Sequence, residues 1–183
     1  MRQNRIPLYF AFSLGLGLSL LCTVPATGQA TQNPTQLSSS LVTAREQPVV
    51  AADKTAYNED TGRYTLTGNV RITMGGRTIA TSRAKISSQT LQVWTDTRTV
   101  LREGELCFTG DALYAELAGN TAWFFGTRCE LKRPGLVIHA DNMDYNWETR
   151  IVTFDGHVYC TQHGHNTTSS HLEFDLDKNA IVG

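Results

Sequence analysis

The chain has 183 residues, of which 18% are charged, and a formal net charge of −1 at pH 7. That length suits one ordinary domain and is short for two. The charge balance argues against a nucleic-acid partner, because such proteins present a strongly basic surface to the phosphate backbone. It also argues against a polybasic surface that would hold the protein on anionic lipid.

The N-terminus has the layout of a secretion signal. Arg2 and Arg5 make a basic start, an apolar run covers residues 6–24, and small residues follow as far as Ala30. We therefore predict that residues 1–30 are a cleavable signal peptide and that the protein is exported. Cleavage lowers the formal net charge from −1 to −3, because it removes two arginines and no acidic residue.

Two other fates of this segment stay open. The apolar run is nearly long enough to cross a bilayer, so it could remain as an uncleaved anchor. Cys22 could carry a lipid, although acylation sites prefer a smaller residue than Leu21 just before the cysteine. Residues 31–47 are polar and nearly free of large apolar side chains, which predicts a flexible leader. The folded domain is then expected over residues 48–183.

Three cysteines remain after cleavage, namely Cys107, Cys129 and Cys160. In an oxidising compartment an odd number allows at most one intramolecular disulfide and leaves one thiol over. Cys107 and Cys129 are the first candidates for a disulfide, because they are close in sequence. The alternative is that some of the cysteines are small buried apolar residues.

Apolar residues of the domain recur at every second position. From Tyr64 to Met74 the even positions are apolar or glycine and the odd positions are polar. This alternation predicts strands with one buried and one exposed face. Gly75 and Gly76 predict a hairpin turn, because glycine tolerates positive φ, and residues 58–62 predict another. No sustained helical stripe is present, so we predict an all-β fold.

One strand–turn–strand pattern occurs twice, 88 residues apart. The two copies share residue types at equivalent positions, namely Asp53 and Asp141, Tyr57 and Tyr145, Gly68 and Gly156, and Val70 and Val158. A looser copy in the middle of the chain sets Asp111 and Gly126 at the separation of Asp53 and Gly68. Such repeats are supersecondary units that need neighbours to bury their apolar faces.

The last residues of the chain also read as strands. Residues 172–176 alternate between apolar and polar side chains, and residues 180–183 predict the start of another strand. An exposed terminal strand is a template for pairing with another chain. We therefore expect this edge to be used in assembly.

The segment from Ala52 to Ile72, ADKTAYNEDTGRYTLTGNVRI, resembles the signature of the OstA-like, or LptA, family. In that family an A-D-x-x-x-Y opening, a turn and an L-T-G-N-V-x-I strand recur along the chain. The second copy, FDGHV at residues 154–158, is a reduced form of the same strand. The resemblance extends over residues 48–183.

The resemblance implies an open β-jellyroll that encloses an apolar groove. It implies a periplasmic transport protein that is not an enzyme, needs no cofactor and serves outer-membrane assembly. Lipopolysaccharide would be held by the acyl chains of its lipid A portion. LptC-like and LptD-like proteins are the implied partners, and protomers would associate through their terminal strands.

The alternation and the resemblance together predict which side chains line the groove. The predicted lipid-binding residues are Leu66, Val70, Ile72, Met74, Ile86, Phe124, Phe154 and Val158. Apolar burial is non-directional and suits a carrier that must hold and then release its cargo. The alternative is that these residues fill a closed core and that the protein is an envelope scaffold or interaction module.

A third hypothesis is a metal-dependent or hydrolytic enzyme. Cys160, His163 and His165 are metal-ligand types close together in sequence. The repeat register, however, sets Cys160 on the inner face and His163 in a turn, so the two side chains should diverge. Asp53 and Asp141 resemble a carboxylate pair, but their equivalent positions predict the same structural role for each. We therefore predict no metal site and no catalytic residues.

Overall fold

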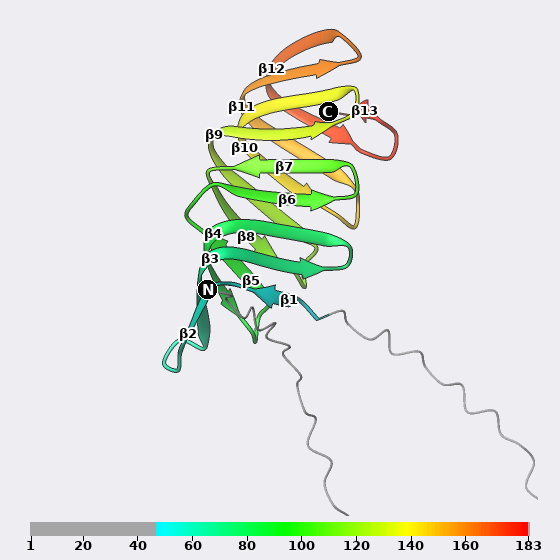
Figure 1. Ribbon diagram of the computed structural model, residues 1–183. Coiled ribbons are helices and arrows are strands. Elements are labelled where there is room, and N and C mark those ends of the chain that lie inside the picture. Colours follow the sequence, from blue (N-terminus) through cyan, green and yellow to red (C-terminus); the bar gives the residue numbers. More distant parts are fainter. Residues whose placement is uncertain (1–46, 183) are drawn as a thin grey trace, which may run out of the picture.

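The computed structural model describes residues 47–182, and every regular element in that range is a β-strand (Figure 1). The strands are β1 (Val49–Ala51), β2 (Lys54–Asn58), β3 (Arg63–Met74), β4 (Arg77–Ser87), β5 (Gln92–Thr95), β6 (Thr99–Glu103), β7 (Leu106–Gly110), β8 (Ala112–Glu116), β9 (Thr121–Arg133), β10 (Leu136–Asn146), β11 (Ile151–Gln162), β12 (His165–Asp175) and β13 (Ala180–Ile181). The predicted all-β fold is confirmed. The predicted signal peptide, Cys22 and all but the last residue of the predicted leader lie outside the described residues. Residues 47–182 contain no membrane-spanning helix.

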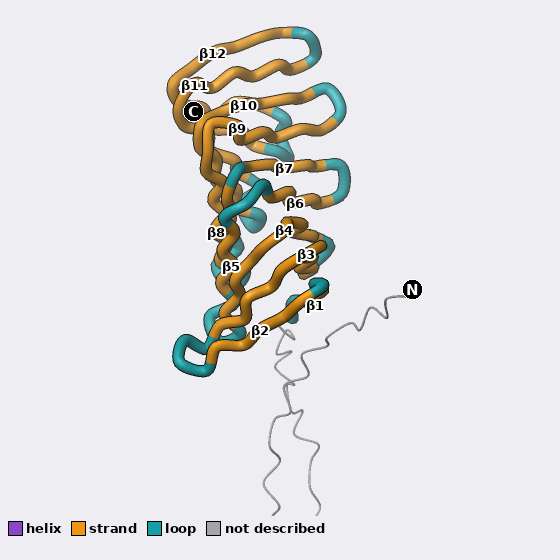
Figure 2. The backbone as a smooth tube through the Cα atoms, turned by 60° about the vertical axis from the view of Figure 1, so that its left-hand side comes forward, coloured by secondary structure: helices purple, strands orange, loops and turns teal. Residues whose placement is uncertain are grey.

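Antiparallel pairing joins the thirteen strands into one sheet that folds into two walls. Residues 85–87 of β4 pair with β5, whereas residues 77–80 of the same strand pair with β6. β9 is split in the same way, since residues 121–125 pair with β8 and residues 130–132 with β7. We call the side that contains β5 and β8 the first wall and the side that contains β6 and β7 the second wall. Figure 2 shows these two pairs on opposite sides of an elongated β-jellyroll.

The walls meet along a line that we call the spine, where the long strands lose their regular register. The pairing of β11 with β12 shifts between Asp155 and Val158, and β3 and β10 have similar shifts. Gly156 lies at this bend with φ at +77°, and a Cβ there would be 2.5 Å from Oδ2 of Asp141. The backbone conformation and the close contact both require glycine.

The same aspartate–glycine contact recurs at two other levels of the spine, at Asp53 with Gly68 and at Asp111 with Gly126. The amide of Asp53 also donates a hydrogen bond of 2.8 Å to the carbonyl of Gly68. Equivalent aspartates therefore close equivalent bends. This geometry supports the structural role predicted for Asp53 and Asp141.

Opposite the spine, the turns of the first wall repeat the same backbone conformation. Each turn contains a residue with positive φ, and these residues are 29 or 30 positions apart: Gly62, Leu91, Asn120, Arg150 and Asn179. A side chain caps the turn, as where Oδ1 of Asn146 accepts hydrogen bonds from the amides of Glu148 and Thr149 at 3.0 Å. The structural unit is thus 29 or 30 residues long, and the predicted 88-residue repeat spans three units.

The three cysteines of the described range are free, so the predicted Cys107–Cys129 disulfide is wrong. Cys129 is fully buried, and burial followed by the nearby carboxylates of Asp111 and Asp141 raises the pKa of its thiol to about 12. Phe108 points into the interior, so its neighbour Cys107 points outward from the strand. The alternative, that some of the cysteines are small buried residues, is confirmed for Cys129 and Cys160 and does not apply to Cys107.

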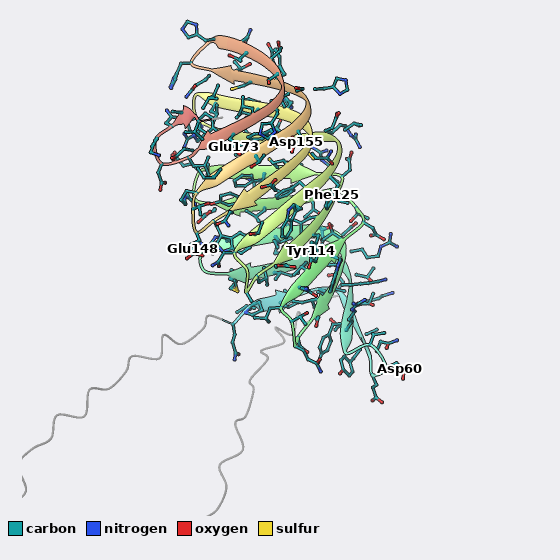
Figure 3. The ribbon with its side chains drawn as sticks, turned by 180° about the vertical axis from the view of Figure 1, so that it is seen from behind. Asp60, Tyr114, Phe125, Glu148, Asp155 and Glu173 are labelled. Carbon is teal, nitrogen blue, oxygen red and sulfur yellow. The ribbon has the colours of Figure 1, made fainter. Side chains whose placement is uncertain are left out.

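The outer face of the first wall carries a stack of three aromatic rings. Trp94, Tyr114 and Trp123 come from the neighbouring strands β5, β8 and β9, with ring centroids 5.7 and 5.3 Å apart. Arg63 lies 4.6 Å above the centroid of Trp94 at one end of the stack. Figure 3 places Tyr114 near the middle of the sheet. Stacked cross-strand pairs of this kind stabilise the sheet from its solvent side.

Candidate functional site

The candidate site is the space between the two walls, because all eight predicted groove residues point into it. The first wall contributes Leu66, Ile86, Phe124 and Phe154, and the second wall contributes Val70, Ile72, Met74 and Val158. Seven of these side chains are buried, and Met74 is half-buried. The alternation of the sequence thus correctly predicts which face of each strand turns inward.

Cross-strand neighbours extend this lining from one end of the sheet to the other. On the first wall one inward row consists of Tyr57, Tyr64, Ile86, Val93, Ala115, Ala122, Tyr145, Val152, Phe174 and Ile181. On the second wall the facing row consists of Val50, Ile72, Ile79, Leu101, Phe108, Leu131, Ile138 and Cys160. The first row is buried in its middle and exposed at its ends, where Tyr57 is 50% and Ile181 is 44% exposed.

Aromatic side chains from both walls fill the middle of this space. The ring of Phe108 on the second wall stacks on Tyr145 of the first wall at 4.4 Å and lies 6.0 Å from Phe124. All three side chains are fully buried. Near the N-terminal end a cleft beside Met74 and Trp147 leaves about 10 Å³, enough for one water molecule. A ligand with acyl chains would therefore have to separate the walls before it could enter.

Opposite the spine, the free edges of the walls face each other across what we call the mouth. The first wall supplies the apolar turn residues Leu91, Leu117, Trp147 and Leu176. The second wall supplies a mixed row at the hairpin ends of its strands, namely Met74, Arg77, Glu103, Leu106, Arg133, Leu136, Gln162 and His165. Four polar members of this row, Arg77, Glu103, Arg133 and Gln162, contact the first wall and hold the mouth closed.

The strongest of these contacts centres on Glu103. Its carboxylate accepts a hydrogen bond of 2.5 Å from the hydroxyl of Tyr145 and one of 2.8 Å from Arg150, both of which belong to the first wall. Arg150 also donates to the Tyr145 hydroxyl. Arg77 lies 3.3 Å from the other Glu103 oxygen and 5.1 Å from the ring centroid of Trp147. We call these five residues the mouth cluster.

Burial raises the pKa of the Tyr145 phenol, and the hydrogen bond to Glu103 raises it further. The phenol is therefore protonated at neutral pH and acts as a donor to Glu103. Its hydroxyl lies at the border between the apolar interior and the charged mouth. Tyr145 thus belongs to both the aromatic filling and the mouth cluster.

A second contact across the mouth lies closer to the C-terminal end. Arg133 donates a hydrogen bond of 3.1 Å to the carbonyl of Leu176 and another to Oδ1 of Asn179. Gln162 donates one of 2.9 Å to the carbonyl of Asn179. This contact involves no carboxylate, which distinguishes it from the mouth cluster.

Both ends of the sheet have strand edges without a partner in residues 47–182. β13 covers only the end of β12, through residues 173–175, and residues 165–171 pair with β11 alone. At the opposite end β1 and β2 pair only with β3. Figure 1 shows these edges at the two extremes of the stack. Unpaired edge groups are ready to bond a strand from another chain.

The residues that suggested a metal site do not converge. Cys160 is buried in the second wall, whereas His163 lies in the exposed turn between β11 and β12. Among residues 47–182, no group of three or more His, Cys, Asp or Glu side chains is arranged to hold a metal ion.

A folded antiparallel sheet with an apolar lining along its whole length defines a class of elongated β-jellyroll proteins. The sequence over residues 49–180 matches the family described as LptA/(LptD N-terminal domain) LPS transport protein. The chain belongs to this family and therefore to lipopolysaccharide transport proteins rather than enzymes. The match includes both LptA and the N-terminal domain of LptD, so it assigns the family and not one of its branches.

A solved structure supports the fold. The chain is similar to LptH from Pseudomonas aeruginosa, described as the LptA-homologous periplasmic component of the conserved lipopolysaccharide transport device. The TM-score is 0.56 at 12% identity, covering 61% of this chain and 83% of LptH. Among curated proteins none is significantly similar in sequence.

Proposed function

We propose that this protein is a periplasmic carrier that holds the acyl chains of lipopolysaccharide between its walls and passes them toward the outer membrane. The observation that carries the proposal is the apolar lining, which runs through every strand pair and ends on the exposed side chains of Tyr57 and Ile181. Each methylene group moved from water into such a lining contributes about 0.8 kcal/mol. Residues 1–30 would direct export of the chain, and their cleavage would release it in the periplasm.

Entry of the acyl chains requires the walls to part at the mouth. The contacts across the mouth are a few hydrogen bonds and ion pairs between partly exposed side chains, whereas the spine is continuous backbone. Opening by rotation about the spine would expose Phe108, Phe124 and Tyr145 to the incoming lipid. The lipid would then replace contacts that the walls make with each other.

Photocrosslinking tests this directly, because adjacent residues of a strand face opposite sides. A photoreactive amino acid at Ile72 or Phe154 should capture lipopolysaccharide. The same probe at the exposed neighbours Thr73 or Asp155 should not. Capture at the outward positions alone would refute the proposed carrier function.

The proposal includes assembly through the strand edges, with LptC-like and LptD-like proteins and with further copies of the chain. The amides of an edge strand alternate between the neighbouring strand and the open side. Of two adjacent substitutions, Thr167→Pro and Thr168→Pro, one should therefore weaken the fold and the other only the assembly. Light scattering over a concentration series, with thermal unfolding as control, separates the two. If neither substitution affects the oligomers, assembly does not use this edge of β12.

The filled interior favours a second candidate, a scaffold module of the envelope that carries no lipid. Phe108, Phe124 and Tyr145 are packed as in an ordinary core. This candidate predicts partner binding through the edges with no lipid captured from any interior position. The crosslinking experiment therefore distinguishes the two functions.

A further inference from the structure

We propose that the mouth cluster is a binding site for an anionic group of the carried amphiphile, and that Glu103 occupies the place of that group in the closed protein. The inference rests on the proposed carrier function and adds to it a site, the chemical class of the group bound and a reason for the mouth to open. The ligand group is a phosphate or another compact polyanion attached to acyl chains.

The first argument is convergence. Two guanidinium groups and one phenol, from Arg77, Arg150 and Tyr145, lie within 3.3 Å of a single carboxylate. Arginine pairs readily with planar or tetrahedral oxyanions, and phosphate offers more acceptor oxygens than a carboxylate. Three donors around Glu103 would therefore also suit a phosphate group.

The second argument is that Glu103 leaves one donor, Nε of Arg77, without a hydrogen bond. Nε of Arg77 is buried but makes no hydrogen bond of good geometry, although it lies 3.3 Å from the carboxylate. A buried N–H without a hydrogen bond costs free energy. An oxyanion with more acceptors than Glu103 could satisfy Arg77 and Arg150 together.

The third argument is position. Tyr145 is one of the aromatic side chains that fill the interior, and its hydroxyl reaches the mouth. Trp147 covers the edge of the interior under Arg77. An amphiphile with its anionic group on the arginines would therefore direct its acyl chains into the space between the walls.

The fourth argument is that binding of the anionic group and opening of the mouth are coupled. Glu103 belongs to the second wall, whereas Tyr145 and Arg150 belong to the first. An anion that displaces Glu103 removes the contact that joins the walls at this level. Binding of the anionic group and opening of the mouth thus become one step. Asp177, 3.4 Å from Arg150, keeps that arginine partly neutralised throughout.

The test uses two soluble probes with the same acyl chains. Dihexanoyl phosphatidic acid carries a phosphate and dihexanoylglycerol does not, and inorganic phosphate alone is the third ligand. Their affinities are measured by calorimetry for the wild type and for Glu103→Gln, which removes the competing charge and keeps the side-chain size. We expect the variant to bind phosphatidic acid about tenfold more tightly and to gain clearly less for diacylglycerol, because a weaker contact across the mouth helps both lipids and removal of the competing charge helps only the anionic one.

Two further variants sharpen the result. Arg150→Gln should lose the preference for phosphatidic acid over diacylglycerol. Gln162→Ala weakens the second contact across the mouth without a change of charge, so any effect should be equal for the two lipids. If Glu103→Gln does not fold, Tyr145→Phe keeps the ring, removes one donor and should reduce the preference for the anionic probe.

Three outcomes would overturn the inference. Equal gains for both lipids in Glu103→Gln would make the cluster a simple latch without an anion site. Unchanged affinities would give Glu103 no part in binding. If inorganic phosphate binds as tightly as phosphatidic acid, the acyl chains contribute nothing to binding and the site has no part in carrying lipid. Failure of the carrier function itself appears separately, as the absence of lipid capture from Ile72 and Phe154.

Discussion

Replacing Gly156 by alanine should destabilise the protein more than the backbone conformation alone predicts. At φ of +77° an L-residue costs about 1–2 kcal/mol relative to glycine. The new Cβ would also lie 2.5 Å from Oδ2 of Asp141, closer than real contacts allow, and 3.0 Å from its Cβ, which is tight. Moving Asp141 breaks its 2.7 Å contact with His157 and strains the spine. We expect a total loss of about 3 kcal/mol, a large part of the stability of an ordinary domain.

Gly76 provides the matched control for this substitution. Its φ is +76°, but nothing lies within 4 Å of the position that a Cβ would take. Gly76→Ala should therefore cost only the conformational part, about 1–2 kcal/mol. Chemical denaturation with urea measures both losses on the same chain.

A double-mutant cycle tests whether the larger loss of stability in Gly156→Ala than in Gly76→Ala comes from the contact with Asp141. Asp141→Ala in the Gly156→Ala background should recover part of the loss, because the carboxylate that makes the closest contact is gone. Equal losses for Gly156→Ala and Gly76→Ala would refute the reasoning. In that case the spine would be able to shift by several tenths of an ångström at no cost.

Three more predictions follow from single residues. The hydrogen bond to Asp141 raises the pKa of His157. The contact therefore stabilises the fold fully below pH ~6.5, and this stabilisation is lost as the pH rises through the folded pKa. An NMR titration should show a lower pKa of His157 in Asp141→Asn. Burial raises the pKa of Cys129, so a thiol reagent should label Cys107 in the native protein and reach Cys129 only on unfolding. Phe124→Ala should cost about 3–5 kcal/mol in urea unfolding, because the fully buried ring leaves a cavity between the walls, and a loss below 1 kcal/mol would mean that the walls close over it.

The strands and their inward faces were predictable, because alternation is a local signal. Leu66, Val70 and Ile72 follow it without exception, and all three are buried. The 29- or 30-residue unit was harder to find. Its turns share a backbone conformation rather than a residue type, as Leu91 and Arg150 show. The two copies that are most similar in sequence are three units apart, which gives the 88-residue spacing, and the middle copy at Asp111 and Gly126 is a looser match.

The contacts across the mouth were not predictable from one sequence. Glu103 and Arg150 are 47 positions apart, on different walls, and no local pattern marks them as partners. The repeat could have drawn attention to Tyr145, which is equivalent to Tyr57. The two differ in burial because Tyr57 lies at the end of the sheet and Tyr145 in its middle. The sequence pattern thus indicates a row, and the position along the stack determines what each member of the row contacts.

The 29- or 30-residue unit also determines how long the interior is. Each unit contributes two strands to each wall, and adjacent strands of a sheet are about 4.8 Å apart. One unit therefore adds about 10 Å to the lined length, together with its own bend at the spine and its own turn at the mouth. Because neighbouring units contact mainly each other, a chain could gain or lose one unit without redesign of the rest. The number of units then acts as a ruler for the distance that one protein spans.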